Sequence, residues 1–319
     1  MHILFVADPL ESFKVHKDTT FSMMRELQKR RHRVSAREVT DIAWAGGSKV
    51  MAAVREIRLT GDAQDWFQPV HGASLQPPAA LQGFTAVVMR KDPPFDSEYF
   101  YATHLLEQAE REGARVFNKP RALRDHPEKL AIMEFAQFCG PTLVTRSASD
   151  IRQFHAEHRD IILKPLDGMG GAGIFRVRED GLNLGAITET LNRDGAQSVM
   201  VQKFLPAITL GDKRVLVIGG KPVPYCLARI PQGSEIRGNL AVGGKGVAQP
   251  LSSRDREIAE AIGPVLSARG LLLVGLDVIG DCLTEINVTS PTGFQEIAQQ
   301  CGFDVAKVFV DALEAALAR

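Results

Sequence analysis

The sequence has no excess of either charge and no long apolar run. Lysine plus arginine and aspartate plus glutamate number 38 each among 319 residues, so the formal net charge is zero. This balance argues against a protein that binds nucleic acid or a membrane surface, although a local basic pocket is compatible with it. No stretch approaches the roughly 20 apolar residues of a membrane-spanning helix. The first apolar run, Ile3 to Ala7, is followed at once by Asp8 and Glu11. It therefore predicts a first strand and no signal peptide, and we expect a cytoplasmic protein.

Cysteine is scarce and scattered. The four cysteines are Cys139, Cys226, Cys282 and Cys301, and no two of them form a Cys-x-x-Cys pair. This spacing argues against a disulfide framework and against a metal cluster, and it is typical of reduced thiols in a reducing compartment.

The segment from Ile161 to Val177, IILKPLDGMGGAGIFRV, combines two short strand signals with a glycine-rich loop. Four of six loop positions are glycine: Gly168, Gly170, Gly171 and Gly173. A backbone without side chains can press its N–H groups against an anion, and Lys164 at the end of the first strand adds a positive charge. The pattern indicates a flap over a nucleotide polyphosphate, with an ordinary mobile hairpin as the alternative.

Commoner nucleotide motifs are incomplete in this chain. A dinucleotide fingerprint and a Walker A loop both require a helix after the glycines, whereas a strand follows here. The triplet His158-Arg159-Asp160 imitates the catalytic loop of protein kinases, but it precedes the glycine loop, and the chain has no Asp-Phe-Gly. These three nucleotide-binding classes are therefore poor explanations of the flap.

A second polar cluster lies in VGLDVIGDCLTEINV, residues 274–288, which predicts a β-hairpin that turns near Gly280. Glu285 and Asn287 project from one face of their strand because they are two residues apart. A three-residue loop over Gly280 to Cys282 would place Asp277 opposite Glu285, and we expect that loop. Two carboxylates and an amide oxygen are ligands that suit Mg²⁺.

The order of the remaining segments predicts an α/β protein. Strands and helices alternate up to residue 124, which is typical of a doubly wound parallel sheet, although residues 49–82 suggest only irregular connection. A helix over residues 126–138 carries Lys129. Residues 231–246 hold five glycines and almost no apolar side chain, which predicts a lid that carries Arg237. We expect an N-terminal substrate-binding domain over 1–124, a small lobe with the flap over 125–200, and a larger lobe with the lid and hairpin over 201–319.

In combination, these motifs resemble the ATP-grasp superfamily and, more closely, the bacterial-type glutathione synthetases. The resemblance runs nearly end to end, and its most specific parts are MRKDPPFD, LKPLDGMGG and RIPQGSEIRGN. It implies an N-terminal doubly wound domain followed by a two-lobed ATP-grasp module.

The resemblance also implies roles for individual residues. ATP would be held by Lys129, Lys164, Gly168, Gly170, Gly171, the hinge of Gln202, Lys203, Phe204 and Leu205, the ribose contact Asp212, and Arg214. A pair of Mg²⁺ ions, with Mn²⁺ as an alternative, would be bound by Asp277, Glu285 and Asn287. The substrates would contact Arg90, Asp18, Arg229, Arg237, Asn287, Ser290, Pro291 and Thr292. Catalysis would depend on Arg214, Arg237 and Lys164.

The reaction implied by the resemblance joins γ-glutamylcysteine to glycine while ATP is cleaved to ADP and phosphate. A carboxylate does not react with an amine at neutral pH, so it must first become an acyl phosphate, which a lid must protect from water. The alternatives are another ATP-dependent carboxylate–amine ligase and a non-catalytic ATP-binding switch. The resemblance further implies a homo-oligomer, either a tetramer or a dimer. Residues 40–82 and the stretch after Thr292, GFQEIAQQ, match no motif of this family.

Overall fold

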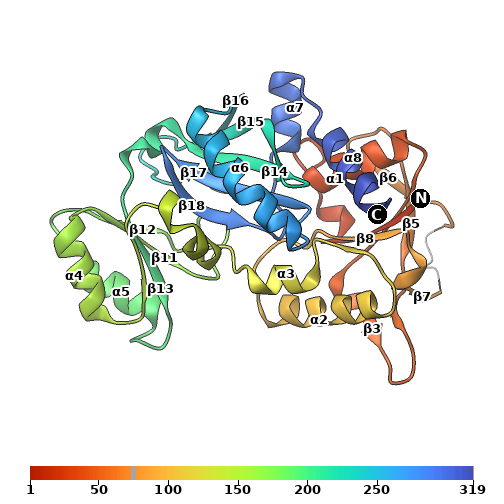
Figure 1. Cartoon of the computed structure of the whole chain (residues 1–319), viewed down its shortest axis with the longest axis horizontal. Coiled ribbons are helices and arrows are strands. Elements are labelled where there is room, and N and C mark those ends of the chain that lie inside the picture. Colours follow the sequence, from red (N-terminus) through yellow and green to blue (C-terminus); the bar gives the residue numbers. More distant parts are fainter. Residues whose placement is uncertain (73–76, 319) are drawn as a thin grey trace.

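The computed structural model describes residues 1–72 and 77–318, and it contains four β-sheets with helices packed around them (Figure 1). In Figure 1 the five-stranded sheet lies in the centre, with the small lobe that carries α4 and α5 to its left and the N-terminal part to its right. Within the described ranges, no helix is both long enough and apolar enough to span a bilayer.

The N-terminal sheet has six strands in the order β6-β5-β2-β1-β8-β9. Its parallel strands are β1 (His2–Val6), β2 (Arg33–Arg37), β8 (Ala86–Met89) and β9 (Val116–Phe117). Two antiparallel strands extend the sheet beyond β2: β5 (Arg55–Leu59), and β6 (Phe67–Pro69) at the edge. The crossover helices α1 (Thr19–Lys29) and α2 (Ser97–Arg111) begin at aspartate caps. The Phe21 N–H donates to Asp18 at 2.6 Å and the Tyr99 N–H to Asp96 at 2.9 Å, which satisfies amides that have no partner inside the helix. The prediction of parallel strands with crossover helices is confirmed.

Our prediction for residues 49–82 was wrong where the structure describes them. This stretch contributes both antiparallel strands of the N-terminal sheet, β5 and β6. It also supplies β4 (Val50–Ala52) and β7 (Ala79–Ala80), which form a separate sheet in the order β3-β4-β7 with β3 (Ile42–Trp44). These strands are two to five residues long, too short for the alternation of apolar and polar residues to be evident in the sequence. Residues 73–76, which belong to the same prediction, lie outside the described residues.

The small lobe is a four-stranded antiparallel sheet with two helices and its own core. The strand order is β10-β13-β11-β12, made of β10 (Thr142–Thr145), β11 (Ile161–Pro165), β12 (Phe175–Val177) and β13 (Val199–Lys203). The helices are α4 (Ala148–His158) and α5 (Leu184–Asn192). Antiparallel pairing of β11 with β12 confirms that strands flank the glycine loop.

The C-terminal sheet has five strands in the order β16-β15-β14-β17-β18. Its strands are β14 (Asp212–Ile218), β15 (Lys221–Ile230), β16 (Lys245–Pro250), β17 (Leu273–Ile279) and β18 (Cys282–Asn287), and α6 (Ser253–Ala268) packs on it. The two-residue turn Gly219-Gly220 joins β14 to β15, and two adjacent glycines between strand-forming segments predict such a hairpin.

The predicted helix over residues 126–138 is also corrected. A short helix, α3 (Pro120–Asp125), ends before Pro127, and a 3₁₀ segment, η4 (Leu130–Phe138), follows it with a kink at Phe135. Pro127 disfavours a helical conformation for His126 before it, which has φ -125° and ψ 67°, so α3 ends there and does not continue into η4.

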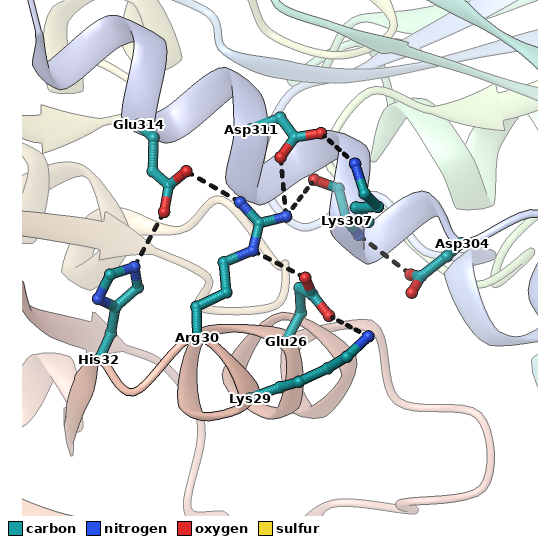
Figure 2. A network of polar contacts seen from close by, with 8 residues as sticks. All are labelled: Glu26, Lys29, Arg30, His32, Asp304, Lys307, Asp311 and Glu314. Atoms are coloured by element: carbon teal, nitrogen blue, oxygen red, sulfur yellow. Dashed lines mark hydrogen bonds and ion pairs between the residues drawn. The ribbon is translucent and has the colours of Figure 1, made fainter.

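The last two helices, α7 (Phe294–Cys301) and α8 (Val305–Leu317), return to the N-terminal part of the chain. Arg30 at the end of α1 contacts Glu26 and Asp311 at 2.8 Å and Glu314 at 2.9 Å (Figure 2). His32 contacts Glu314 at 2.9 Å in the same network. Beneath it, buried side chains from β1, α1, α7 and α8 form one apolar cluster. The two ends of the chain therefore belong to one packed unit.

Candidate active site

A pocket of about 430 Å³ lies where the flap, the C-terminal sheet and the N-terminal part meet. Thirteen of the residues singled out from the sequence line it: Asp18, Lys129, Gly168, Gly170, Gly171, Arg214, Arg229, Asp277, Glu285, Asn287, Ser290, Pro291 and Thr292. Segments that are far apart in the sequence thus contribute to one cavity.

The acidic hairpin places Asp277 opposite Glu285, as predicted, but by a different route. The turn has two residues, because Ile279 pairs with Cys282. A bulge at Thr284 then shifts the register between Val278 and Asp277. An extra residue in one strand shifts the pairing of the residues beyond it by one position, as an extra residue in the loop would. The predicted three-residue loop was therefore wrong, while the facing pair of carboxylates is confirmed.

Buried arginines and aspartates alternate across β14, β15 and β17. Arg214 Nε donates to Asp277 Oδ1 at 2.6 Å, and Arg229 Nη2 lies 2.8 Å from Asp277 Oδ2 and 2.6 Å from Asp212 Oδ2. Burial alone would raise the pKa of Asp277, but the two guanidinium groups hold that pKa well below its usual range. For Asp212, burial dominates and raises the pKa to about 6. The floor of the pocket therefore carries two fixed positive charges beside an ionised Asp277.

The two predicted phosphate-binding lysines approach the hairpin from the small-lobe side. Lys129 Nζ donates to Gly168 O of the flap at 2.5 Å and lies 3.2 Å from Glu285 Oε1. Lys164 Nζ donates to Thr284 O at 3.3 Å. Burial lowers the pKa of Lys164, and the positive charge of Lys129 adds to the effect. An anion placed between the two ammonium groups would favour their charged forms.

The lid touches the flap. Arg237 Nη1 donates to Gly171 O at 3.0 Å, and Arg237 Nη2 lies 2.5 Å from Glu235 within the lid itself. Gly171 has a positive φ of 87°, and a Cβ at this position would lie 2.8 Å from Asn239 Oδ1. The positive φ favours glycine at this position, and a larger residue would also force the lid side chain of Asn239 to shift.

Eight predicted residues lie outside the lining of this pocket: Arg90, Lys164, Gln202, Lys203, Phe204, Leu205, Asp212 and Arg237. Arg90 is buried behind the pocket wall, where it donates to Thr20 Oγ1 at 3.0 Å and to Pro291 O at 3.2 Å. The hinge comprises the last two residues of β13 and the two that follow it, and the Arg176 guanidinium lies 3.5 Å from the centre of the Phe204 ring. Asp212 Oδ1 is buried and has no hydrogen-bond partner.

Sequence reasoning missed two acidic residues that line the pocket, Glu128 and Glu296. Glu296 lies in the first turn of α7, and its Oε2 is buried without a hydrogen-bond partner. Burial raises the pKa of Glu296, while the nearby Lys17 and His16 oppose that shift. Lys17 lines the same pocket. No local pattern marks Glu296, because its partners come from a loop nearly 280 residues earlier in the chain.

The hairpin offers oxygen ligands suited to a hard divalent cation. Asn287 Nδ2 donates to Gly275 O at 3.2 Å, which orients the amide so that Oδ1 is the atom left for a ligand. With the carboxylates of Asp277 and Glu285, this set contains no soft donor and fits Mg²⁺ or Mn²⁺.

Comparison with known proteins agrees with this arrangement. The family model described as the N-terminal domain of prokaryotic glutathione synthetase matches residues 1–124, and the model of its ATP-grasp domain matches residues 128–302. The chain belongs to the prokaryotic glutathione synthetase family.

Individual relatives in this family match over almost their whole length. The glutathione synthetase of Ralstonia nicotianae is 58% identical over 99% of this chain and 96% of its own length. The glutathione synthetase of Nitrosomonas europaea is 56% identical over 100% of this chain and 99% of its own.

Among solved structures, the D-cycloserine synthetase DcsG covers 99% of both chains with a TM-score of 0.69 and 15% identity. The macrocyclase MdnC of Microcystis aeruginosa covers 99% of this chain and 100% of its own with a TM-score of 0.63 and 14% identity. At these identities the structural likeness shows the fold alone, which is the ATP-grasp fold.

Proposed function

We propose that this chain catalyses the ATP- and metal-dependent joining of γ-glutamylcysteine to glycine, with glutathione, ADP and phosphate as products. The observation that carries the proposal is the meeting of flap, acidic hairpin and paired arginines in one pocket of a chain that is 58% identical to a glutathione synthetase over 99% of its length. The substrates are small molecules, and ATP and a divalent metal are required.

The proposed chemistry begins when the cysteinyl carboxylate takes the γ-phosphoryl group of ATP. Lys129 and Lys164 would neutralise the phosphates, and the flap amides would orient them. Bound metal would offset charge on the transferring phosphoryl group, with Asp277, Glu285 and Asn287 as ligands for a pair of Mg²⁺ or Mn²⁺ ions.

Formation of the peptide bond follows when the glycine amine attacks the acyl phosphate. Arg214 is proposed to stabilise the tetrahedral oxyanion. Arg229 and Arg237 are proposed to contact the bound substrates. Both Arg214 and Arg229 are held by Asp277, so they need not reorganise during the reaction. The lid would exclude water from the acyl phosphate until glycine reacts.

The adenosine end of ATP is proposed to lie at the hinge of residues 202–205. Asp212 Oδ1, buried without a partner, could accept a hydrogen bond from a ribose hydroxyl. Arg90 is proposed to bind a carboxylate of the peptide substrate, next to Ser290, Pro291 and Thr292, which are proposed to line the acceptor site. The domain divisions at residues 124 and 200, a homo-oligomeric state and a cytoplasmic location are part of the same proposal.

Glu296 is proposed to bind the α-ammonium group of the γ-glutamyl moiety. Its unpartnered Oε2 and the adjacent Lys17 match the ammonium and carboxylate of an amino-acid head group. Glu296→Gln should raise KM for γ-glutamylcysteine about 10- to 100-fold, as expected for loss of a charge-assisted hydrogen bond, with little change in kcat. Steady-state kinetics at saturating ATP and glycine would measure this. Glu260→Gln, an exposed position on α6, is the control, and an unchanged KM in Glu296→Gln would refute the assignment.

Gly171→Ala should loosen the lid over the flap, because the new Cβ would meet Asn239 at 2.8 Å. We expect turnover to fall about tenfold and the ratio of phosphate released to glutathione formed to rise above one, since water would reach the acyl phosphate. The matched control is Gly233→Ala, which has a similarly positive φ of 61° but nothing within 4 Å of the new Cβ. An equal ratio of phosphate released to glutathione formed in the two variants would contradict the proposal that this contact excludes water.

The decisive experiment is phosphate release by the purified chain with ATP, Mg²⁺ and γ-glutamylcysteine, with and without glycine. Release that depends on both substrates and yields a tripeptide thiol is the expected result. ATP binding without release would contradict the proposal and favour another acid–amine pair or a nucleotide switch.

A further inference from the structure

The buried side chain of Asn118 and the partly buried side chain of Glu128, both from outside the C-terminal sheet, hold Val288, the residue that directly follows β18. Glu128 Oε1 accepts a hydrogen bond from the Val288 N–H at 2.9 Å, and Asn118 Nδ2 donates to Val288 O at 2.8 Å. Both polar groups of one peptide residue are thus fixed by side chains, at a point where the strand has ended and no neighbouring strand can hold them.

Each side chain makes further bonds that fix its own position. Glu128 Oε1 also accepts from the Thr289 N–H at 3.0 Å and from Thr289 Oγ1 at 2.8 Å, and Glu128 O accepts from the Ile286 N–H at 3.0 Å. Asn118 Nδ2 donates to Leu273 O at 2.8 Å, and Asn118 Oδ1 accepts from the Leu273 N–H at 3.1 Å. Asn118 therefore joins the start of β17 to the end of β18.

The held segment lies between the residues that the proposed function needs. Asn287, whose amide would bind metal, precedes Val288, and Ser290 to Thr292 follow within four residues. All of these line the pocket. A rotation of the Val288 peptide would turn the Asn287 side chain and displace the segment that follows it.

We propose that Asn118 and Glu128 are positioning residues that fix Asn287 for metal binding and Ser290 to Thr292 for the substrate. This inference rests on the proposed function, and it assigns a task to two residues that are outside the proposed set of metal and phosphate ligands. Removal of the residues that hold metal ligands in place commonly weakens metal binding by about 10- to 100-fold.

The geometry separates the effect of position from the effect of charge. A glutamine at position 128 keeps a side-chain oxygen that can accept the same three hydrogen bonds, whereas an alanine leaves three partly buried donors without this partner. The carboxylate charge lies near Glu285, and burial followed by the Glu285 charge raises the pKa of Glu128. A positioning role predicts that Glu128→Gln retains function and that Glu128→Ala does not.

The test is the binding of Mn²⁺ in the presence of ADP, followed by electron paramagnetic resonance, alongside steady-state kinetics of the full chain. Glu128→Ala should weaken Mn²⁺ binding about 10- to 100-fold, and Glu128→Gln should stay within about threefold of the native chain. Asn118→Ala should weaken Mn²⁺ binding by a similar factor from the opposite side of Val288, and it carries the test if Glu128→Ala does not fold. The control is Glu134→Gln, in which the altered residue forms an exposed ion pair with Arg269 in the same region of the chain.

Two results would overturn the inference. Native-like Mn²⁺ binding in folded Glu128→Ala or Asn118→Ala would show that the hydrogen bonds to Val288 do not position Asn287 for metal binding. A loss in Glu128→Gln equal to that in Glu128→Ala would assign the effect to charge. Because Mn²⁺ binding is read directly, it remains informative even if the native chain fails to form glutathione, which would contradict the proposed function alone.

Discussion

Replacing Arg214 with lysine is expected to lower kcat by about 100- to 1,000-fold while the affinity for ATP changes by less than about threefold. The guanidinium group donates to both oxygens of Asp277, at 2.6 and 3.2 Å, so its plane is fixed toward the pocket. A lysine retains the charge but cannot form this bidentate contact, and its ammonium would not lie where the oxyanion develops. The loss should therefore appear in the chemical step and spare nucleotide binding.

The measurement is kcat from phosphate release combined with ATP affinity from equilibrium titration. Breaking a buried pair by removing one partner costs about 3–5 kcal/mol of stability, which is why lysine is preferred to alanine here. Thermal unfolding of the variant should be compared with that of Arg256→Lys, an exposed position on α6. If kcat and ATP affinity fall by equal factors, Arg214 serves binding and not the transition state.

Glu285→Gln is expected to lower turnover by about 1,000-fold and to raise the Mg²⁺ concentration for half-maximal activity at least tenfold, by analogy with the loss of other charge-stabilising groups. Glu285 faces Asp277 across the hairpin and lies 3.2 Å from the Lys129 ammonium. Its charge would therefore act on the metal and hold a phosphate-binding lysine at the same time. The amide cannot replace the charge, although it matches the shape of the carboxylate.

The Mg²⁺ dependence of phosphate release would test this, with Glu257→Gln on the exposed face of α6 as the control. Excess Mg²⁺ should restore part of the lost activity if the charge acts through metal affinity. Unchanged metal dependence together with native turnover would remove Glu285 from the proposed ligand set.

The sequence predicted the elements of this protein more reliably than their exact pairing. The strand–glycine–strand pattern of residues 161–177 and the Gly219-Gly220 turn were recognised because local residue types determine them. The hairpin carrying Asp277 and Glu285 was recognised with the right facing residues and the wrong loop. Alternation along a strand reports which residues face each other, but a bulge and a longer loop satisfy it equally.

Residues that act through distant partners escaped the sequence altogether. Glu128 was next to a recognised lysine, yet its hydrogen bonds reach Val288 and Thr289, 160 residues away. Glu296 lies in a stretch without any motif and becomes notable only through its burial in the pocket. Arg90 was named as a substrate contact from the family resemblance, whereas the structure buries it behind the pocket wall. Tertiary contacts determine these environments, and no local pattern records them.

The joining of the two chain ends has a consequence for the order of folding. The apolar cluster that contains Ile3 and Phe5 is completed by Phe309 and Leu313 of the last helix. At synthesis rates of about 5–20 residues per second, the interval between emergence of the first 124 residues and the end of the chain is roughly 10–40 seconds. During that interval the apolar side chains of β1 that pack against α8 are not yet covered by it. The N-terminal part is therefore made first but becomes fully stable last, and truncation near the C-terminus would damage the beginning of the protein.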